Sequence, residues 1–180
     1  MNIFYIDKDP QIAAQNMVDR HVVKMILETA QLLSTAHRVL DGVEYEGRSA
    51  SGRKAKRWRL SDGRDDILYT ATHINHPSAV WVRRSNNNYT WLFSHFCYLL
   101  KEYTYRYGKL HKCADPIFHD QLSRLPKNIP TSYFTPVTPA MPEEYLVGAD
   151  SVASYRNYYK NGKKHLHKWT NRPQPEWLVN

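Results

Sequence analysis

The sequence has few of the features that mark extracellular or membrane proteins. It has two cysteines, Cys97 and Cys113, and neither belongs to a C-x-x-C pair. This excludes a disulfide framework and a cysteine-based zinc site. No apolar run approaches the length of a membrane span, and the stretch MNIFYIDKDP lacks the charged-then-apolar layout of a signal peptide. We expect a soluble, cytoplasmic protein without membrane contacts.

Spacings typical of a metal site are also lacking. His73 and His76 lie close together, and His165 and His167 lie far along the chain, but there is no H-E-x-x-H or Cys/His pattern. We therefore expect no metal and no cofactor, and we interpret His76 as a loop residue that hydrogen-bonds beside Pro77.

Basic residues, in contrast, are abundant. The chain has 180 residues, with 25 Lys and Arg against 17 Asp and Glu, for a formal net charge of +8. This balance favours a polyanionic partner such as nucleic acid. The length predicts a single domain over residues 1–180, and we expect a monomer. Thirteen Tyr and five Trp can serve either a core or a base-stacking surface.

The pattern of caps and apolar residues predicts a mainly α domain built on two long packed helices. MNIFYID is expected to form an extended N-terminal arm or an edge strand. Asp9-Pro10 begins a short helix, and Asp19 offers a cap for a long helix that runs to about Leu40. The other predicted helices are a long one at about 87–107, capped by Ser85 or Asn86, a short one after Asp115-Pro116, and one at about 150–160.

Three segments are predicted to be irregular. Residues 43–66 are rich in Gly, Ser, Arg and Lys and predict a basic loop that is an insertion in the domain. Residues 126–147 predict a proline-rich loop, and residues 161–180 a basic and aromatic tail. The stretch AVWVRR after Pro77 is ambiguous between strand and helix.

The first long helix carries a narrow polar stripe on a mostly apolar circumference. A sector of roughly 100° holds Arg20, His21, Lys24, Glu28, Gln31 and Thr35. One interpretation is that Lys24 and Glu28 form a simple i,i+4 pair beside solvent. The other is that the stripe faces a cleft, where Glu28 stabilises positive charge or moves protons.

The second long helix repeats this pattern more weakly. His95, Glu102 and Arg106 share a sector, so the two His-x6-Glu stripes could wall one cleft. The simpler interpretation, which we favour, makes Glu102 an ordinary surface residue.

Two basic segments contain aromatic residues, as is typical of nucleic-acid contacts. Residues 48–64 hold seven Lys or Arg, one acid and Trp58, whose indole could stack on a base. Residues 156–172 hold six Lys or Arg and no acid. The predicted DNA-binding residues are Arg20, Lys24, Arg53, Lys54, Lys56, Arg57, Trp58, Arg59, Arg83, Arg84, Lys163, Lys164, Lys168 and Trp169.

The order of these elements resembles the pyrimidine-dimer DNA glycosylases of the phage endonuclease V type. In that family an N-terminal arm precedes a helix in which Asp, His and Glu match Asp19, His21 and Glu28. The family's N-H-P element and the end of its second helix resemble residues 75–77 and 102–108, and its C-terminal aromatic and basic segment resembles the surroundings of Trp169.

The resemblance implies a DNA glycosylase with associated AP-lyase activity on damaged or modified pyrimidines in double-stranded DNA. Its catalytic residues would be Glu28, His21 and the amine of Met1 or Asn2, with His21 and Lys24 orienting Glu28 or holding a phosphate. The family has Thr at position 2, where this chain has Asn, which favours retention of Met1. An α-amine ordinarily titrates near pH ~8 and is partly nucleophilic at pH 7.

Two other hypotheses remain. The chain could be a DNA-binding or DNA-modifying phage protein of the host cytoplasm that uses the same scaffold without lyase chemistry. Alternatively, it could be a metal-dependent nuclease that uses His73, His76 or aspartates.

Overall fold

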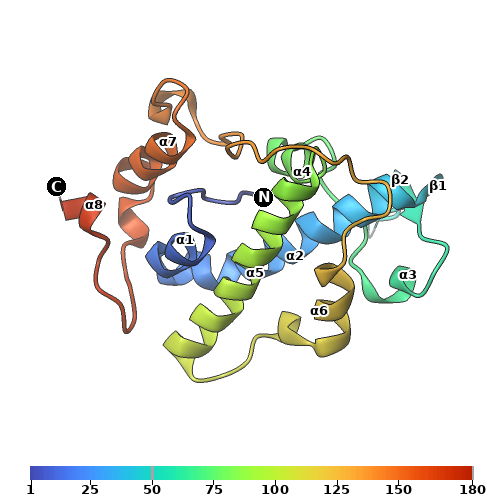
Figure 1. Ribbon diagram of the computed structural model, residues 1–180, viewed down its shortest axis with the longest axis horizontal. Helices are drawn as coiled ribbons and strands as arrows, with labels where there is room; N and C mark the ends of the chain where they lie inside the picture. The colour runs from blue at the N-terminus through green and yellow to red at the C-terminus, as the bar shows by residue number, and fades with distance from the viewer. Residues whose placement is uncertain (50, 180) are drawn as a thin grey trace.

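A computed structural model describes residues 1–49 and 51–179 and is mainly α-helical, as predicted (Figure 1). In this part of the chain the elements are α1 (Pro10–Asn16), α2 (Asp19–Asp41), β1 (Val43–Arg48), β2 (Lys54–Arg59), α3 (Arg64–Ile67), α4 (Pro77–Val82), α5 (Asn86–Tyr107), η1 (Lys112–Ala114), α6 (Pro116–Ser123), η2 (Glu143–Tyr145), α7 (Ser151–Asn157), the π-helical turn η3 (Tyr158–Gly162), η4 (Lys164–Leu166) and α8 (Glu176–Val179).

Helices α2 and α5 cross and pack against each other, and α1 packs on α5 (Figure 1). Local signals set the ends of α5: the Ser85 hydroxyl accepts from the Asn87 and Asn88 amides, and Gly108 adopts φ +65°. The predicted cap of α2 was wrong. Asp19 lies inside the first turn of α2, and Val18 occupies the cap position without a side-chain hydrogen bond.

Residues 43–66 are not an irregular loop. Strands β1 and β2 form an antiparallel hairpin with Val43 opposite Arg59 and Arg48 opposite Lys54, and α3 follows. Residue 50 lies outside the described residues. The hairpin packs Trp58, 9% exposed, toward the end of α2, where a Cβ on Gly42 would lie 3.2 Å from the Trp58 Cβ. The ambiguous stretch after Pro77 is helical and forms α4.

The proline-rich segment 126–147 is a loop, as predicted, apart from the short turn η2. Side chains of α4 and α5 hold it in place: the Trp81 indole donates to the Thr135 carbonyl at 2.9 Å, and Asn88 accepts from the Thr135 amide at 2.9 Å. The loop leads to α7, and the N-terminal arm lies between α7 and α5 (Figure 1).

The arm is neither a helix nor a strand, but it belongs to the core. Ile3, Phe4, Tyr5 and Ile6 are each at most 5% exposed. Arg156 donates to the Ile6 carbonyl and to the Asp7 carboxylate, each at 2.8 Å. Within the described residues, no helix is both long and apolar enough to span a membrane.

Candidate active site

Glu28 lies where the buried arm begins. The Asn2 amide donates to Glu28 Oε2 at 3.0 Å, and the α-amine of Met1 lies 4.0 Å from the same oxygen. Lys24 Nζ lies 3.2 Å from the other oxygen, Oε1. The predicted i,i+4 pair therefore exists, and the same carboxylate also faces the amino end of the chain. The Glu28 side chain is 13% exposed, whereas that of Lys24 is 67% exposed.

The Asn2 side chain anchors the start of the arm. Its Oδ1 accepts from the Tyr155 hydroxyl and from the Ile3 amide, each at 2.8 Å, and its Nδ2 donates to the Ala140 carbonyl at 2.7 Å. Tyr155 is fully buried and also accepts from the Ala140 amide at 3.2 Å. Asn2, which stands where the family has Thr, therefore positions the start of the arm, including the backbone nitrogens of residues 1 and 2.

His21 supports the arm rather than Glu28. Its ring stacks on Phe4 with centroids 4.0 Å apart, and its Nδ1 lies 2.5 Å from the Tyr159 hydroxyl. Burial, together with the positive charge of Lys163, Lys24 and His165, lowers the pKa of His21 to about 3. The contacts of His21 are with Phe4 and Tyr159, and its predicted roles toward Glu28 or a phosphate stay predictions.

His76 forms the hydrogen bond beside Pro77 that the sequence predicted, and it is also a candidate for the Glu28 site, a role that the sequence interpretation did not assign to it. Its Nδ1 accepts from the Ser78 amide at 3.2 Å, so it caps α4. Burial, the amino terminus and His73 lower its pKa, and Glu28 acts in the opposite direction. The charges of the amine and of Glu28 therefore both influence the pKa of His76. The N-H-P element contained this signal, but hydrogen bonding next to Pro77 was the simpler explanation.

The second stripe does not share this site. Glu102 is 3% exposed, so its interpretation as a surface residue is wrong. Arg106 donates to Glu102 Oε1 at 2.7 Å and to Asp19 at 2.9 Å, and Arg172 donates to Oε2 at 2.8 Å. His95 is buried, with its ring 2.9 Å from the Pro10 carbonyl, and burial lowers its pKa to about 4.

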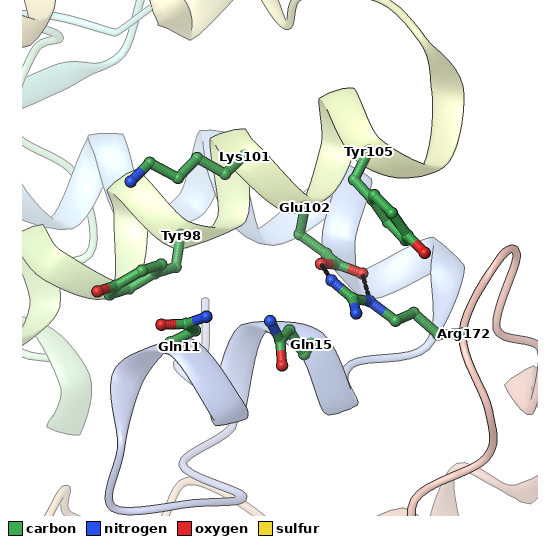
Figure 2. A pocket seen from close by; sticks show the side chains of 7 residues that line it. All are labelled: Gln11, Gln15, Tyr98, Lys101, Glu102, Tyr105 and Arg172. Carbon is green, nitrogen blue, oxygen red and sulfur yellow. Dashed lines mark hydrogen bonds and ion pairs between the residues drawn. The ribbon is translucent and has the colours of Figure 1, made fainter.

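A small cavity lies beside this buried charge cluster. Its volume is about 330 Å³, and the amides of Gln11 and Gln15 from α1 face Tyr98, Lys101 and Tyr105 from α5 across it (Figure 2). Glu102 and Arg172 lie at the end of the cavity beside Tyr105, bonded to each other (Figure 2). At the other end, Lys101 lies over the Tyr98 ring, 5.2 Å from its centroid.

The predicted DNA-binding residues separate into exposed and structural groups. Trp58 is buried, so its predicted stacking on a base does not fit the structure. Trp169 is half-buried and donates to the Asn16 carbonyl at 2.9 Å, and half-buried Arg83 donates to the Ile74 carbonyl at 2.6 Å. Lys163 and Arg57 are also half-buried. The exposed residues are Arg20, Lys24, Arg53, Lys54, Lys56, Arg59, Arg84, Lys164 and Lys168.

Two buried tyrosines, Tyr155 and Tyr159, complete the supports of the arm and were not predicted. No motif marks either one, because their roles depend on contacts with residues 2 and 21 across the fold. In the part of the chain that the structure describes, no group of three His, Cys, Asp or Glu side chains is placed to hold a metal ion.

These elements define a mainly helical protein in which a carboxylate meets the amino end of a buried arm. A family model described as pyrimidine dimer DNA glycosylase matches residues 1–115, which include the arm, Glu28 and His76. The match covers more than half of the chain, so the protein belongs to the pyrimidine dimer DNA glycosylase family. Membership implies a glycosylase that binds DNA. Searches of curated proteins and of solved structures gave no match.

Proposed function

We propose that the protein is a DNA glycosylase with associated AP-lyase activity on damaged pyrimidines in double-stranded DNA. The observation that carries this proposal is the placement of Glu28 Oε2, 3.0 Å from the Asn2 nitrogen and 4.0 Å from the Met1 α-amine. A carboxylate beside an amine is suited to stabilise a cationic imine and to carry protons to and from it.

The α-amine attacks C1′ of the target nucleotide, and the bond from C1′ to the base breaks with its electron pair leaving on the base. Loss of a proton from nitrogen and opening of the sugar ring give an imine between the protein and C1′. Removal of a C2′ proton then breaks the C3′–O bond and cleaves the strand. Glu28 stabilises the cationic imine and relays these protons, while Lys24 holds its other oxygen at 3.2 Å.

Exposed cations on α2 and on the tail suit a polyanionic substrate. Lys24 and Arg20 lie exposed on α2, and Lys164 and Lys168 lie exposed on the tail. Each such side chain can neutralise a phosphate and release a counterion. An enzyme that reaches C1′ inside a duplex must also extrude the nucleotide, which fits a protein that binds the backbone strongly.

The second candidate function is DNA binding or modification on this scaffold without lyase chemistry. It is favoured by one observation: the nitrogen 3.0 Å from Glu28 is the Asn2 peptide nitrogen, whereas the α-amine lies a further 1 Å away (3.0 Å against 4.0 Å). A peptide nitrogen is not a nucleophile.

Borohydride trapping on duplexes that contain an abasic site or a pyrimidine dimer separates the two functions. Under the first proposal the wild-type protein forms a covalent adduct, and peptide mapping places it on the first residue of the mature chain. The mass of the intact protein shows whether Met1 is retained and therefore which residue carries the α-amine. A protein with an acetylated N-terminus is the matched control and should bind DNA without forming an adduct. Absence of an adduct in the unblocked protein, with salt-dependent binding retained, would establish the second function instead.

A further inference from the structure

The two faces of the β1–β2 hairpin differ in charge. Directly opposite residues of an antiparallel pair project from the same face. The lysine face therefore carries the pairs Glu44–Trp58, Glu46–Lys56 and Arg48–Lys54, and the arginine face carries Val43–Arg59, Tyr45–Arg57 and Gly47–Ala55. The sequence reveals only a basic segment, because the separation into faces requires the register.

Two acids of the same hairpin pair with the two lysines of the lysine face. The third cation of this face, Arg48, donates to the Gly52 carbonyl at 3.0 Å and forms no ion pair within the described residues, so this face keeps one positive charge whereas the arginine face keeps two. Lys54 Nζ lies 2.9 Å from Glu46, and Lys56 Nζ lies 2.9 Å from Glu44. All four side chains are at least 48% exposed, so the ion pairs add little to stability. They do give both lysines a carboxylate partner, which a phosphate would have to displace.

The arginine face keeps its positive charge. The Arg59 guanidinium lies over the Tyr45 ring, 5.1 Å from its centroid. The stem of Arg57 lies over Gly47, where an added Cβ would come within 2.8 Å of Arg57 Cγ. No ion pair is seen for Arg57 or Arg59 in the described part of the chain; the nearby Asp65 is already bonded to Arg38 at 2.6 Å.

Exposed apolar surface lies beside these cations. Val43 is 71% exposed and Tyr45 is 42% exposed. An arginine face with a tyrosine and a valine suits a surface that alternates phosphates with sugars, since guanidinium groups bind phosphate oxygens in a bidentate manner and the apolar groups can pack on deoxyribose. A two-stranded ribbon also has the width of a major groove.

We propose that the arginine face of the hairpin, and not the lysine face, binds the backbone of duplex DNA at a distance from the reacting nucleotide. This rests on the proposed function only in that the target nucleotide lies at Glu28. From Glu28 to Gly42 the chain follows α2 for 14 residues, about 21 Å at 1.5 Å per residue. At 3.4 Å per base pair this distance corresponds to about six base pairs when α2 runs along the duplex axis, which is the orientation that we propose.

The test compares two double variants that remove the same charge from opposite faces, Arg57→Ala/Arg59→Ala and Lys54→Ala/Lys56→Ala. Binding is measured by fluorescence anisotropy at several salt concentrations, on a 25-base-pair duplex that carries a tetrahydrofuran abasic analogue. We expect the arginine variant to bind at least about tenfold more weakly and to lower the slope of log K against log salt by about 1.8, since each phosphate contact contributes about 0.9. The lysine variant should stay within about threefold of wild type.

Equal losses in the two variants, or no loss in the arginine variant, would overturn the proposal. Circular dichroism confirms that each variant is folded, and Arg57→Gln/Arg59→Gln repeats the test if the alanine variant is not. The analogue cannot form an imine, so this measurement stands even if the lyase chemistry is absent.

The length of duplex on each side of the analogue tests the proposed distance between the hairpin contact and the target nucleotide. Two asymmetric duplexes keep only four base pairs on one side of the analogue or on the other. With one of them the wild type and the arginine variant should bind alike, because the hairpin contact is missing. A persistent difference on both duplexes would contradict a contact six base pairs away.

Discussion

Glu28 and Glu102 have similar sequence surroundings and opposite environments. Each lies on a long helix, seven residues after a histidine and four residues from a cation. Both oxygens of Glu102 accept from guanidinium groups, and its side chain is 3% exposed. Glu28 faces an amine, a backbone amide and the exposed Lys24. A carboxylate with both oxygens bonded to arginines has a structural role, whereas the surroundings of Glu28 are compatible with the catalytic role that we propose for it.

The largest expected effect concerns the structural role of Glu102. Glu102→Ala should destabilise the protein by about 3–5 kcal/mol, because it removes the carboxylate shared by Arg172 and the fully buried Arg106, and leaves Asp19 as the remaining acidic partner of Arg106. Urea unfolding measures the change. Glu28→Ala is the matched control and should cost less, about 1–2 kcal/mol, since Lys24 is exposed and the main loss is the acceptor of the Asn2 amide. Equal losses of stability in Glu102→Ala and Glu28→Ala would show that the two glutamates contribute equally to folding, which contradicts this prediction.

Glu28→Gln tests the catalytic role that we propose for Glu28. We expect trapping and strand cleavage on abasic duplex to slow by about 10²- to 10³-fold, because a neutral amide does not stabilise a cationic imine or relay its protons. Single-turnover assays at saturating DNA measure the rate. Lys24→Ala removes the exposed partner but keeps the carboxylate, so it should lose far less. A Glu28→Gln protein with the wild-type rate would show that Glu28 has no catalytic role.

The histidines predict how stability depends on pH. Folding lowers the pKa of His21 from 6.5 to about 3, so the unfolded chain binds a proton below pH 6.5 that the folded protein does not bind. Stability should therefore be complete above pH 6.5 and fall as the pH drops toward 3, by about 1 kcal/mol per unit between pH 6 and 5 for this residue. His95 and His37, each with a pKa lowered to about 4, act in the same direction.

Urea unfolding at pH 7, 6 and 5 checks this dependence. A His21→Phe protein retains stacking on Phe4 and should lose stability with a slope smaller by about one proton. An unchanged slope would show that His21 is not buried in its neutral form.

The smallest expected effect concerns the support of the arm. Tyr155→Phe removes the hydroxyl that donates to Asn2 Oδ1 at 2.8 Å and accepts from the Ala140 amide. We expect a loss of about 1 kcal/mol in stability, and a trapping rate reduced severalfold at saturating DNA, because the amine is positioned less accurately. Tyr69→Phe, which removes a hydroxyl remote from the arm, should leave that rate unchanged. If Tyr155→Phe and Tyr69→Phe have equal trapping rates, the hydrogen bond from Tyr155 to the arm does not contribute to catalysis.

Local signals were enough to predict both ends of α5 and the starts of α1 and α6, although not the cap of α2. Ser85, Gly108, Asp9-Pro10 and Asp115-Pro116 act within one turn of the elements that they begin or end, so each is readable from neighbouring residues. The hairpin was missed because its two strands contain little apolar alternation. Its pairing is supported by Trp58 and by ion pairs across the strands, which exist only once the register is formed.

In the candidate site, too, some features follow from neighbouring residues and others depend on contacts between distant ones. The polar stripe identified Glu28 and Lys24, and the N-H-P element contained His76, because spacing on a helix or beside a proline is local information. The burial of Glu102 could not be predicted, because Arg172 lies 70 residues away in the sequence. The roles of Tyr155 and Tyr159 depend on separations of 153 and 138 residues.

The sequence by itself determined the helical class, the basic charge and the residues that can carry amine and carboxylate chemistry, since caps, periodicity and side-chain type act over a few residues. Only the tertiary structure decided which glutamate meets the amino end and which is enclosed by arginines. It also decided that His21 is neutral and that the cations of the hairpin separate into two faces. Each of these outcomes depends on burial and on partners that are distant in the sequence, and those exist only after the chain has packed.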